Sequence, residues 1–239
     1  MSSLKGKTIY GFGDSIIAGH YLKIGMLDHV VEKNEMKLTN YAVNGATVIP
    51  DIAKQIPELI WVWDIAKQIA HASDFSPDFI CFDGLTNDAV EMVKDHYLGK
   101  ITDNYQGGYD TETFIGAFEN ICDQLRRKYQ NSHIFYIAVH HMPLQSEETQ
   151  CCLQYWARTV CKKWSIPVIN VFEKGGINTC IDGMRYEFSY NGEGETKDGN
   201  GVHLNSEGYR LWYAPMIEAE LKKYKDYEQV AQADCEYPI

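Results

Sequence analysis

The chain has 239 residues, 45% of them hydrophobic, and carries a formal net charge of −11. Its length and hydrophobic content are those of one large domain with a buried core, and the acidic balance argues against nucleic acid, whose phosphates it would repel. No apolar run reaches the roughly 18 residues that a bilayer-spanning helix needs, so no membrane partner is expected.

Strand-like and helix-like patterns alternate from one end of the chain to the other. In chain order we expect a strand at 8–12, a helix at 24–34, a strand at 38–43, helical spacing over 51–72, a strand at 78–83, a helix at 113–129, a strand at 133–139, a helix at 146–164, a strand at 167–171 and a final helix at about 206–224. Repeated β–α units of this length predict a three-layer α/β fold, with a parallel sheet of about five strands between two layers of helices. We expect residues 1–225 to form a single domain and residues 226–239 a charged tail.

Polar residues with catalytic potential follow three of the expected strands. Ser15 comes just after the first strand, Gly45 just after the second and Asn87 just after the third. In open α/β sheets, sites form outside the carboxyl ends of the strands, so these three residues are expected at one edge of the sheet. His203 precedes the final helix and can reach the same edge.

Together these residues supply the groups that acyl transfer requires. A serine hydroxyl becomes a nucleophile when a base such as His203 takes its proton. Gly45 has no side chain to block its backbone N–H, and the Asn87 amide can donate, so both can stabilise an oxyanion. Each residue alone has a simpler interpretation: Ser15 as a helix cap, His203 as a packing residue, and Gly45 and Asn87 as turn residues.

The same residues resemble the motifs of the GDSL, or SGNH, hydrolases, a flavodoxin-like group of esterases and lipases. Four short motifs carry the resemblance, in the family's order and over most of the chain: Gly-Asp-Ser at 13–15, Gly45, Asn-Asp at 87–88 and Gly-Val-His at 201–203. The resemblance implies a flavodoxin-like fold with Ser15 as the nucleophile and His203 as the base. It also implies an oxyanion hole formed by the N–H groups of Ser15 and Gly45 and by the Asn87 side chain.

The third member of the catalytic triad departs from the family pattern. The family has aspartate three residues before the histidine, where this chain has Asn200, and an amide cannot supply the charge that stabilises an imidazolium. Three interpretations stay open: Asp198 takes this role, a backbone carbonyl orients His203 in a Ser–His dyad, or activity is low or absent. Asn200-Gly201 is also prone to deamidation, which would supply the missing carboxylate by chemistry alone.

The motif around Asn87 departs from the family in a smaller way. The family has glycine two residues before the asparagine, and here that position is Leu85, preceded by Gly84. We expect this difference to shift the turn without removing Asn87 from the site.

The expected activity is that of a serine esterase on a small-molecule ester with a short acyl group, for example acetyl on a carbohydrate. His140 and Tyr109 are weaker candidates for substrate contacts, with packing as the alternative for both. Two other functions stay open: a longer-chain lysophospholipase or thioesterase, and a catalytically impaired protein that binds carbohydrate or acyl groups. No organic cofactor is expected, and no metal, because no carboxylate or thiol falls at a helpful local spacing.

Cysteine usage and the start of the chain predict where the protein resides. The seven cysteines are an odd set without C-x-x-C spacing, which favours reduced thiols that pack as small hydrophobes. The first residues lead into a strand without the apolar segment of a signal peptide. These features predict a cytoplasmic protein.

Overall fold

Five parallel strands form the centre of the protein. The computed structural model describes residues 3–50, 64–91, 97–190 and 199–233. Neighbouring strands pair in the order β2-β1-β3-β4-β5, and each of these pairs is parallel. Their bounds are β1 Thr8–Phe12, β2 Lys37–Asn40, β3 Phe79–Phe82, β4 His133–Ala138 and β5 Val168–Asn170. This order is the flavodoxin-like one, so the predicted fold class is confirmed.

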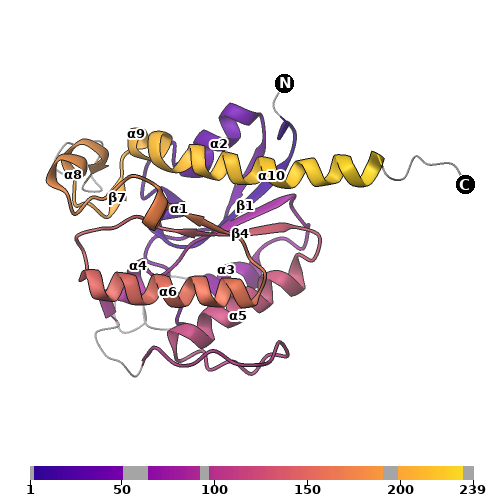
Figure 1. Cartoon of the computed structure of the whole chain (residues 1–239), viewed down its shortest axis with the longest axis horizontal. Helices are drawn as coiled ribbons and strands as arrows, with labels where there is room; N and C mark the ends of the chain where they lie inside the picture. The colour runs from indigo at the N-terminus through magenta and orange to yellow at the C-terminus, as the bar shows by residue number, and fades with distance from the viewer. Residues whose placement is uncertain (1–2, 51–63, 92–96, 191–198, 234–239) are drawn as a thin grey trace, which may run out of the picture.

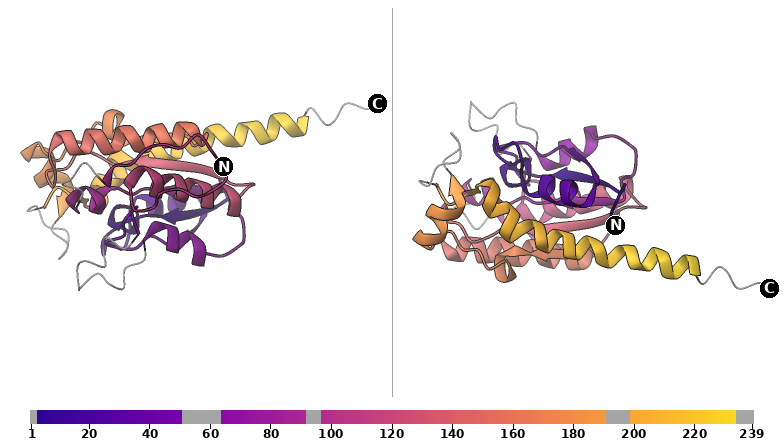
Figure 2. Two further views of the ribbon diagram at one scale, coloured as in Figure 1. Left: turned by 90° about the horizontal axis from the view of Figure 1, so that it is seen from below. Right: turned by 90° about the horizontal axis from the view of Figure 1, so that it is seen from above.

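Helices cover both faces of the sheet. α2 and α10 lie on one face and α3, α5 and α6 on the other (Figure 1), and two turned views show the same layers (Figure 2). The helices are α1 Ser15–Ala18, α2 Met26–Asn34, α3 Ile65–His71, α4 Thr86–Glu91, α5 Phe114–Lys128, α6 Glu147–Lys163, α7 Val171–Lys174, α8 Asp182–Phe188, α9 Ser206–Gly208, a π-helical segment Tyr209–Tyr213, and α10 Ala214–Ala233. A short antiparallel pair, β6 (Ser189–Tyr190) and β7 (His203–Leu204), lies outside the main sheet.

The central strands are apolar along their length because both of their faces are covered. β3 reads Phe-Ile-Cys-Phe with all four residues buried, and β1 is buried from Ile9 to Phe12. A parallel strand between two layers of helices has no side that faces water. Each large apolar side chain removed from water contributes about 1.5–3 kcal/mol. This burial fixes the strands and therefore the loops at their carboxyl ends.

The two long helices on one face begin with side-chain caps. The Thr113 hydroxyl accepts from the Gly116 N–H at the start of α5, and Ser146 accepts from the Thr149 N–H at the start of α6. Such a cap contributes about 1 kcal/mol to stability. Acidic residues in the first turn of α6 and lysines in its last turn also complement the helix dipole.

The sequence located most elements to within a few residues, with three differences. The predicted end of the final helix was wrong: the helical segment contains a π-helical stretch and continues to Ala233 instead of ending near residue 224. Residues 51–63 of the predicted helical segment lie outside the described residues, and α3 begins at Ile65. Several short elements were not predicted: helices α1, α4, α7 and α8 and strands β6 and β7. Of these, α8 and β6 lie in a polar stretch without clear periodicity. The division at residue 225 into a domain and a tail stays a prediction.

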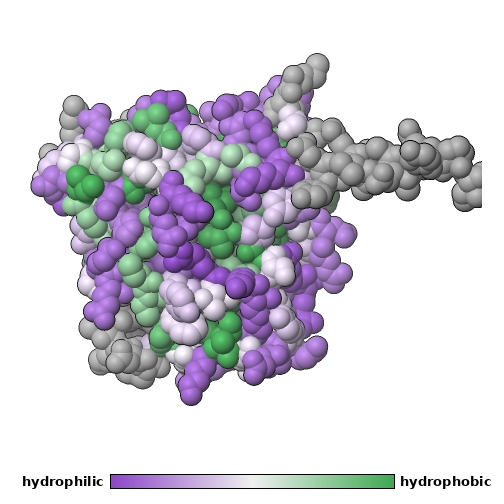
Figure 3. Space-filling view, viewed as in Figure 1, coloured by the Kyte–Doolittle hydropathy of each residue, from purple (hydrophilic) through white to green (hydrophobic). Residues whose placement is uncertain are grey.

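One broad face of the molecule is mainly hydrophilic. Hydrophobic residues show there in a narrow central strip and in smaller spots (Figure 3). Within the described part of the chain, no helix combines the length and the apolar character that crossing a membrane requires.

The turn after β1 packs its backbone against the end of β3. Gly13 has a φ of +144°, and a Cβ at this position would overlap the Asp83 Oδ1 atom. The side-chain amide of Gln68, on α3, accepts from the Gly13 N–H and donates to the Gly13 carbonyl, both at 2.9 Å. Glycine is therefore required here both for its backbone conformation and for the space it leaves.

We expect Gly13→Ala to lower the free energy of unfolding by about 3 kcal/mol or more, because it combines an unfavourable φ with overlap of a buried carboxylate. Urea denaturation followed by circular dichroism measures this change. Gly183→Ala is the matched control, since a Cβ there meets no atom within 4 Å. The control should be neutral or stabilising by up to about 1 kcal/mol. Equal stability of the Gly13→Ala protein and the wild type would contradict this account of the turn.

Candidate active site

A hydroxyl and an imidazole far apart in sequence meet at the carboxyl edge of the sheet. The Ser15 Oγ lies 2.9 Å from the His203 Nε2, and both residues are buried, with 4% and 8% of their surfaces exposed. Ser15 is the first residue of α1, and His203 belongs to β7. Both elements lie at the same end of the molecule (Figure 1). The two side chains are therefore within proton-transfer distance.

Two buried carboxyl groups shape the turn that carries Ser15. The Asp14 side chain accepts from the Ile16 N–H and caps α1. Asp83, at the end of β3, accepts from the Asp14 N–H at 2.9 Å and from the Ile17 N–H at 3.2 Å. Because Ser15 lies between these bonded N–H groups, the orientation of its backbone is fixed from both sides.

The loop after β2 brings candidate oxyanion donors next to Ser15. Gly45 has a left-handed φ of +82°, and the Asn87 Nδ2 donates to the Ala46 carbonyl at 2.8 Å. An amide nitrogen has two hydrogens, so this bond leaves the second for a substrate oxygen. The Ser15 N–H is at the start of a helix, where N–H groups lack partners within the helix. These three donors are the predicted oxyanion set.

A third buried carboxyl group, that of Asp88, fixes the loop after β2. Asp88 accepts from the Val48 N–H at 2.8 Å and from the Ile49 N–H at 2.9 Å. Asp88 belongs to α4, one residue after Asn87, so these bonds tie the Asn87 helix to the Gly45 loop.

Leu85, where the family pattern has glycine, adopts a backbone conformation that favours glycine. Its φ is +147°, and its side chain is buried. A non-glycine residue in such a region costs of order 1–3 kcal/mol. Burial of the leucine side chain offsets a cost of this size. The turn before Asn87 therefore keeps the glycine-type conformation although the glycine is replaced.

The Asn200 amide has a defined orientation relative to His203. Its Oδ1 accepts from the Val202 N–H at 2.8 Å and from the His203 N–H at 3.2 Å. Two donors at this point require the oxygen and exclude the NH₂ group. The Nδ2 therefore faces the His203 Nδ1, at 3.4 Å. Asn200, which stands where the family motif has aspartate, thus presents a donor to the His203 Nδ1.

This orientation favours the imidazole tautomer that is wrong for a base. A donor opposite Nδ1 favours a lone pair on Nδ1 and hence the hydrogen on Nε2, next to Ser15. Burial lowers the pKa of His203 to about 3, and the nearby His20 and His140 contribute to this shift. The ring is therefore neutral at ordinary pH, and the imidazolium that must form when Ser15 loses its proton lacks a carboxylate partner.

His20 stacks face to face on His203. The ring centroids are 3.6 Å apart and the ring planes differ by 5°. His20 has a left-handed φ of +41°, and the Tyr190 hydroxyl donates to the carbonyls of Gly19 and His20, which holds this segment in place. Burial lowers the pKa of His20, so this ring is neutral as well. Because the nearby His20 is one of the groups that lower the pKa of His203, the stacked pair favours the neutral form of His203 over its imidazolium.

The carboxyl groups beneath the site are harder to ionise than usual. Burial raises the pKa of Asp14 to about 6 and that of Asp88 to about 7. The pKa of Asp83 is also raised, by burial and then by the neighbouring Asp14 carboxyl. These folded-state values exceed the unfolded ones. Their stabilising contribution is therefore full below about pH 4 and is lost as the pH rises through 6 to 7.

The two weaker candidates for substrate contacts lie away from the Ser15 pocket. His140 is buried, and its Nδ1 lies 2.7 Å from the Tyr213 hydroxyl and its Nε2 3.2 Å from the Gly201 carbonyl. It therefore supports the loop that leads to His203. Tyr109 packs edge to face on Trp164, beside Lys163. Asp198, the other candidate for the triad acid, lies outside the described residues.

An open cavity of about 520 Å³ surrounds the Ser15–His203 pair. Tyr21, Asn44, Thr86, Leu144 and Val202 complete its lining together with the residues above. Most of the lining residues have polar side chains and Leu144 and Val202 are its aliphatic members, although the surface that faces the cavity is mainly apolar.

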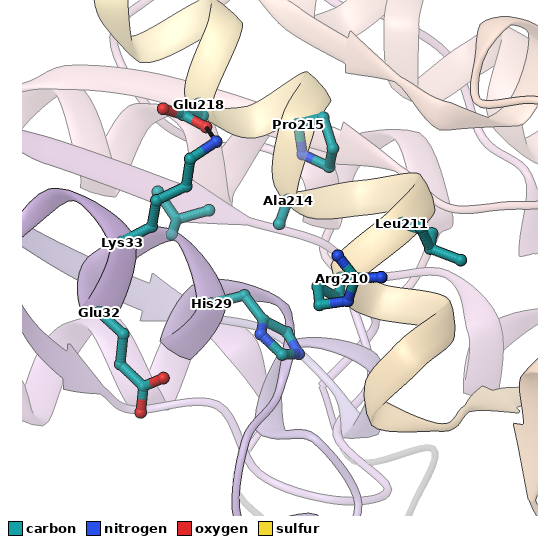
Figure 4. Close-up of a pocket in the computed structure, with 9 residues that line it drawn as sticks. His29, Glu32, Lys33, Arg210, Leu211, Ala214, Pro215 and Glu218 are labelled. Atoms are coloured by element: carbon teal, nitrogen blue, oxygen red, sulfur yellow. Dashed lines mark hydrogen bonds and ion pairs between the residues drawn. The ribbon is translucent and has the colours of Figure 1, made fainter.

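A second cavity, of about 470 Å³, lies between α2 and α10 (Figure 4). Three of its four charged lining residues have partners: Lys33 pairs with Glu218 at 2.7 Å, and Arg210 pairs with Glu207. His29 is bonded to Ser206. In the described part of the chain, no three His, Cys, Asp or Glu side chains form a group that could hold a metal ion.

Three supporting residues were not identified from the sequence. Asp83 ends a predicted strand, and Gln68 lies in a predicted helix, but neither belongs to a motif with a catalytic meaning. His20 follows Ser15 by five residues, and only the left-handed backbone at the end of α1 turns its ring onto His203. A one-dimensional pattern contains no signal for such a turn.

The buried Ser–His contact lies at the carboxyl edge of a three-layer α/β/α fold. The sequence profile of the GDSL-like Lipase/Acylhydrolase family matches residues 12–211. The chain therefore belongs to this family and is an ester hydrolase. No curated protein matches the chain.

Solved structures show the same fold at low sequence identity. A protein from Lactobacillus plantarum is 18% identical, with a TM-score of 0.73 over 92% of this chain and 98% of that one. The lipase/acylhydrolase from Enterococcus faecalis is 21% identical, with a TM-score of 0.54 over 91% of this chain and 96% of that one. At such identities the comparison supports the fold and not the substrate.

Replacing the stacked ring tests the contribution of His20. We expect His20→Phe to raise the pKa of His203 and to move the acid limb of the pH–kcat/KM profile to higher pH, because it keeps a ring at this position and removes the charge that His20 can carry. His20→Ala removes the ring as well, which exposes His203 to water, and should move the acid limb at least as far. Both variants have the same left-handed backbone, so strain affects them equally. An unchanged profile in both variants would contradict this account of the stacked pair.

Asn200→Asp tests the orientation of the amide. The carboxylate would accept the same two N–H groups with one oxygen and receive the His203 Nδ1–H with the other. We expect kcat to rise by roughly 10²- to 10⁴-fold, the range by which a triad acid acts in serine proteases. The pKa of His203 should rise, so the acid limb of the pH–kcat/KM profile should move to higher pH. An unchanged rate and profile would show that Asn200 does not limit His203.

Proposed function

We propose that the protein is a serine esterase for small esters with short acyl groups, in which Ser15 is the nucleophile and His203 the base. The observation that carries this proposal is the 2.9 Å contact between Ser15 Oγ and His203 Nε2. The donors at Ser15, Gly45 and Asn87 beside that contact support the same role.

In the acylation half of the reaction, Ser15 Oγ attacks the ester carbonyl carbon and His203 Nε2 takes the hydroxyl proton. The N–H groups of Ser15 and Gly45 and the amide of Asn87 stabilise the negative charge on the carbonyl oxygen. His203 then gives the proton to the leaving alcohol, and the acyl group stays on Ser15. In deacylation, His203 takes a proton from water while the water oxygen bonds to the acyl carbon. The bond from that carbon to Ser15 Oγ then breaks, Oγ takes the proton back from His203, and the acid leaves.

This cycle needs the His203 hydrogen on Nδ1, opposite the Asn200 amide. In that tautomer the Nδ1–H of His203 faces the Nδ2–H of Asn200, and two donors repel each other. The protein with Asn200 therefore works as a Ser–His dyad at a reduced rate. The stacked His20 does not compensate for this, because it helps to lower the pKa of His203 and so disfavours the imidazolium.

The walls of the cavity favour a short acyl group. Asn44, Thr86 and Asn200 offer hydrogen bonds, and Leu144 and Val202 supply aliphatic contacts. These two side chains can cover a short acyl group, whereas most methylene groups of a long chain would extend beyond them. An acetyl ester of a polyhydroxy alcohol, such as a sugar, matches this lining better than a lysophospholipid does.

Hydrolysis of p-nitrophenyl acetate by the wild type, Ser15→Ala and His203→Ala tests the catalytic pair. The same two substitutions are also made in the Asn200→Asp protein, which is expected to be faster, so that a loss of activity is easier to measure. We expect both to reduce turnover to the uncatalysed level in either background, because nucleophile and base act as a unit. Equal activity of the Ser15→Ala proteins and their parents would overturn the assignment.

A series of p-nitrophenyl esters from acetyl to decanoyl tests the acyl preference. An enzyme with a long apolar pocket gains about 0.8 kcal/mol, or roughly fourfold in kcat/KM, for each buried methylene. We expect no such rise beyond the shortest members of the series. A steady rise through the longer chains would instead identify the protein as a longer-chain lipase or thioesterase.

A further inference from the structure

We propose that Asn200 is a self-modification site, at which the Gly201 nitrogen converts the asparagine to aspartate and thereby supplies the missing carboxylate to His203. The effect on activity rests on the proposed function, whereas the modification itself does not. Asn200, Gly201 and their bonding partners form the site.

The hydrogen bonds of the Asn200 side-chain amide prepare it for attack by a nucleophile. The N–H groups of Val202 and His203 both donate to its Oδ1, at 2.8 and 3.2 Å. When a nucleophile adds to the amide carbon, this oxygen acquires negative charge, and two donors already in place stabilise it. Asn200 is exposed, so the water needed for hydrolysis can reach it.

The attacking nitrogen is also held in place. The Gly201 N–H donates to the Ser189 Oγ at 3.1 Å, and the Gly201 carbonyl accepts from Thr179 Oγ1 at 2.5 Å. Gly201 has a φ of +79°, and a Cβ would lie 2.6 Å from the Pro143 Cδ. The fold therefore requires glycine here, and glycine is the residue whose nitrogen reaches a preceding asparagine with least hindrance.

The reaction needs only water as a co-reactant. The Gly201 nitrogen loses its proton and bonds to the Asn200 Cγ, while the bond from Cγ to Nδ2 breaks and Nδ2 takes up a proton to leave as ammonia. Water then cleaves the new bond between Cγ and the Gly201 nitrogen, which leaves aspartate in an unchanged backbone. Cleavage of the other ring bond would leave isoaspartate.

The aspartate would fit the place of Asn200 without rearrangement. One carboxylate oxygen keeps the N–H groups of Val202 and His203, and the other replaces the Nδ2 that now lies 3.4 Å from the His203 Nδ1. An acceptor at this point puts the hydrogen on Nδ1 and frees Nε2 to accept the Ser15 proton. The modification therefore corrects the tautomer that Asn200 disfavours.

The chain contains an internal comparison for this reactivity. Asn44-Gly45 is the same dipeptide and lines the same cavity, with Gly45 at a similar φ of +82°. The Asn44 Oδ1 is buried and has no hydrogen-bond partner, so no donors are placed to stabilise an oxyanion there. Deamidation should therefore be faster at Asn200 than at Asn44.

The experiment follows the full-length protein from fresh purification through prolonged warm incubation at slightly alkaline pH. Peptide mapping by mass spectrometry measures deamidation at residues 44 and 200, and a protease that cleaves before aspartate but not isoaspartate separates the two products. The rate of p-nitrophenyl acetate hydrolysis is measured on the same samples. Asn200→Asp gives the fully converted rate, and Asn200→Gln, which does not form the five-membered ring readily, is the control that should not change with time.

We expect aspartate to accumulate at residue 200 ahead of residue 44, and activity to rise in proportion to that fraction toward the Asn200→Asp rate. An intact Asn200, isoaspartate as the only product, or an equal rise in the Asn200→Gln protein would overturn the proposal. If aspartate forms but the Asn200→Asp protein hydrolyses no ester, the proposed function fails while the modification stands, because mass alone reports the modification.

Discussion

The hydrogen bonds from the backbone to the buried Asp83 carboxyl are the constraint on which the site depends. Asp83 ends β3, and its two oxygens accept the N–H groups of Asp14 and Ile17 on either side of Ser15. Burying a carboxyl group is costly unless hydrogen bonds satisfy it, so the turn and the carboxyl hold each other in place. Gly13 allows this close approach because it has no Cβ.

The opposite side of the site is built without a carboxylate. His203 lies between a stacked ring, His20, and an amide, Asn200. Both neighbours favour the neutral imidazole of His203, whereas the proposed ester hydrolysis requires the imidazolium as a transient species. In the proposed mechanism the contact between Ser15 and His203 is in place, and the electrostatics of the base is the weak element. One atom, the Nδ2 of Asn200, accounts for the difference between a dyad and a triad.

The sequence predicted the catalytic edge because strand ends are visible in hydrophobic patterns. Apolar runs located β1, β2 and β3, and the parallel topology then placed Ser15, Gly45 and Asn87 at one edge. His203 was found through its motif, and not through periodicity, since 188 residues separate it from Ser15. Helix α8 and strand β6 were missed because tertiary contacts, and not local patterns, stabilise them.

The sequence by itself determined the fold class, the four motif residues and the absence of aspartate at residue 200. These features follow from residue type and spacing, and both can be read from the linear sequence. Only the tertiary structure decided which side of the Asn200 amide faces His203, because two backbone N–H groups select the oxygen. It also decided that His20 stacks on His203 and that His140 supports the Gly201 loop. Such contacts depend on backbone conformations and loop packing that no local pattern specifies.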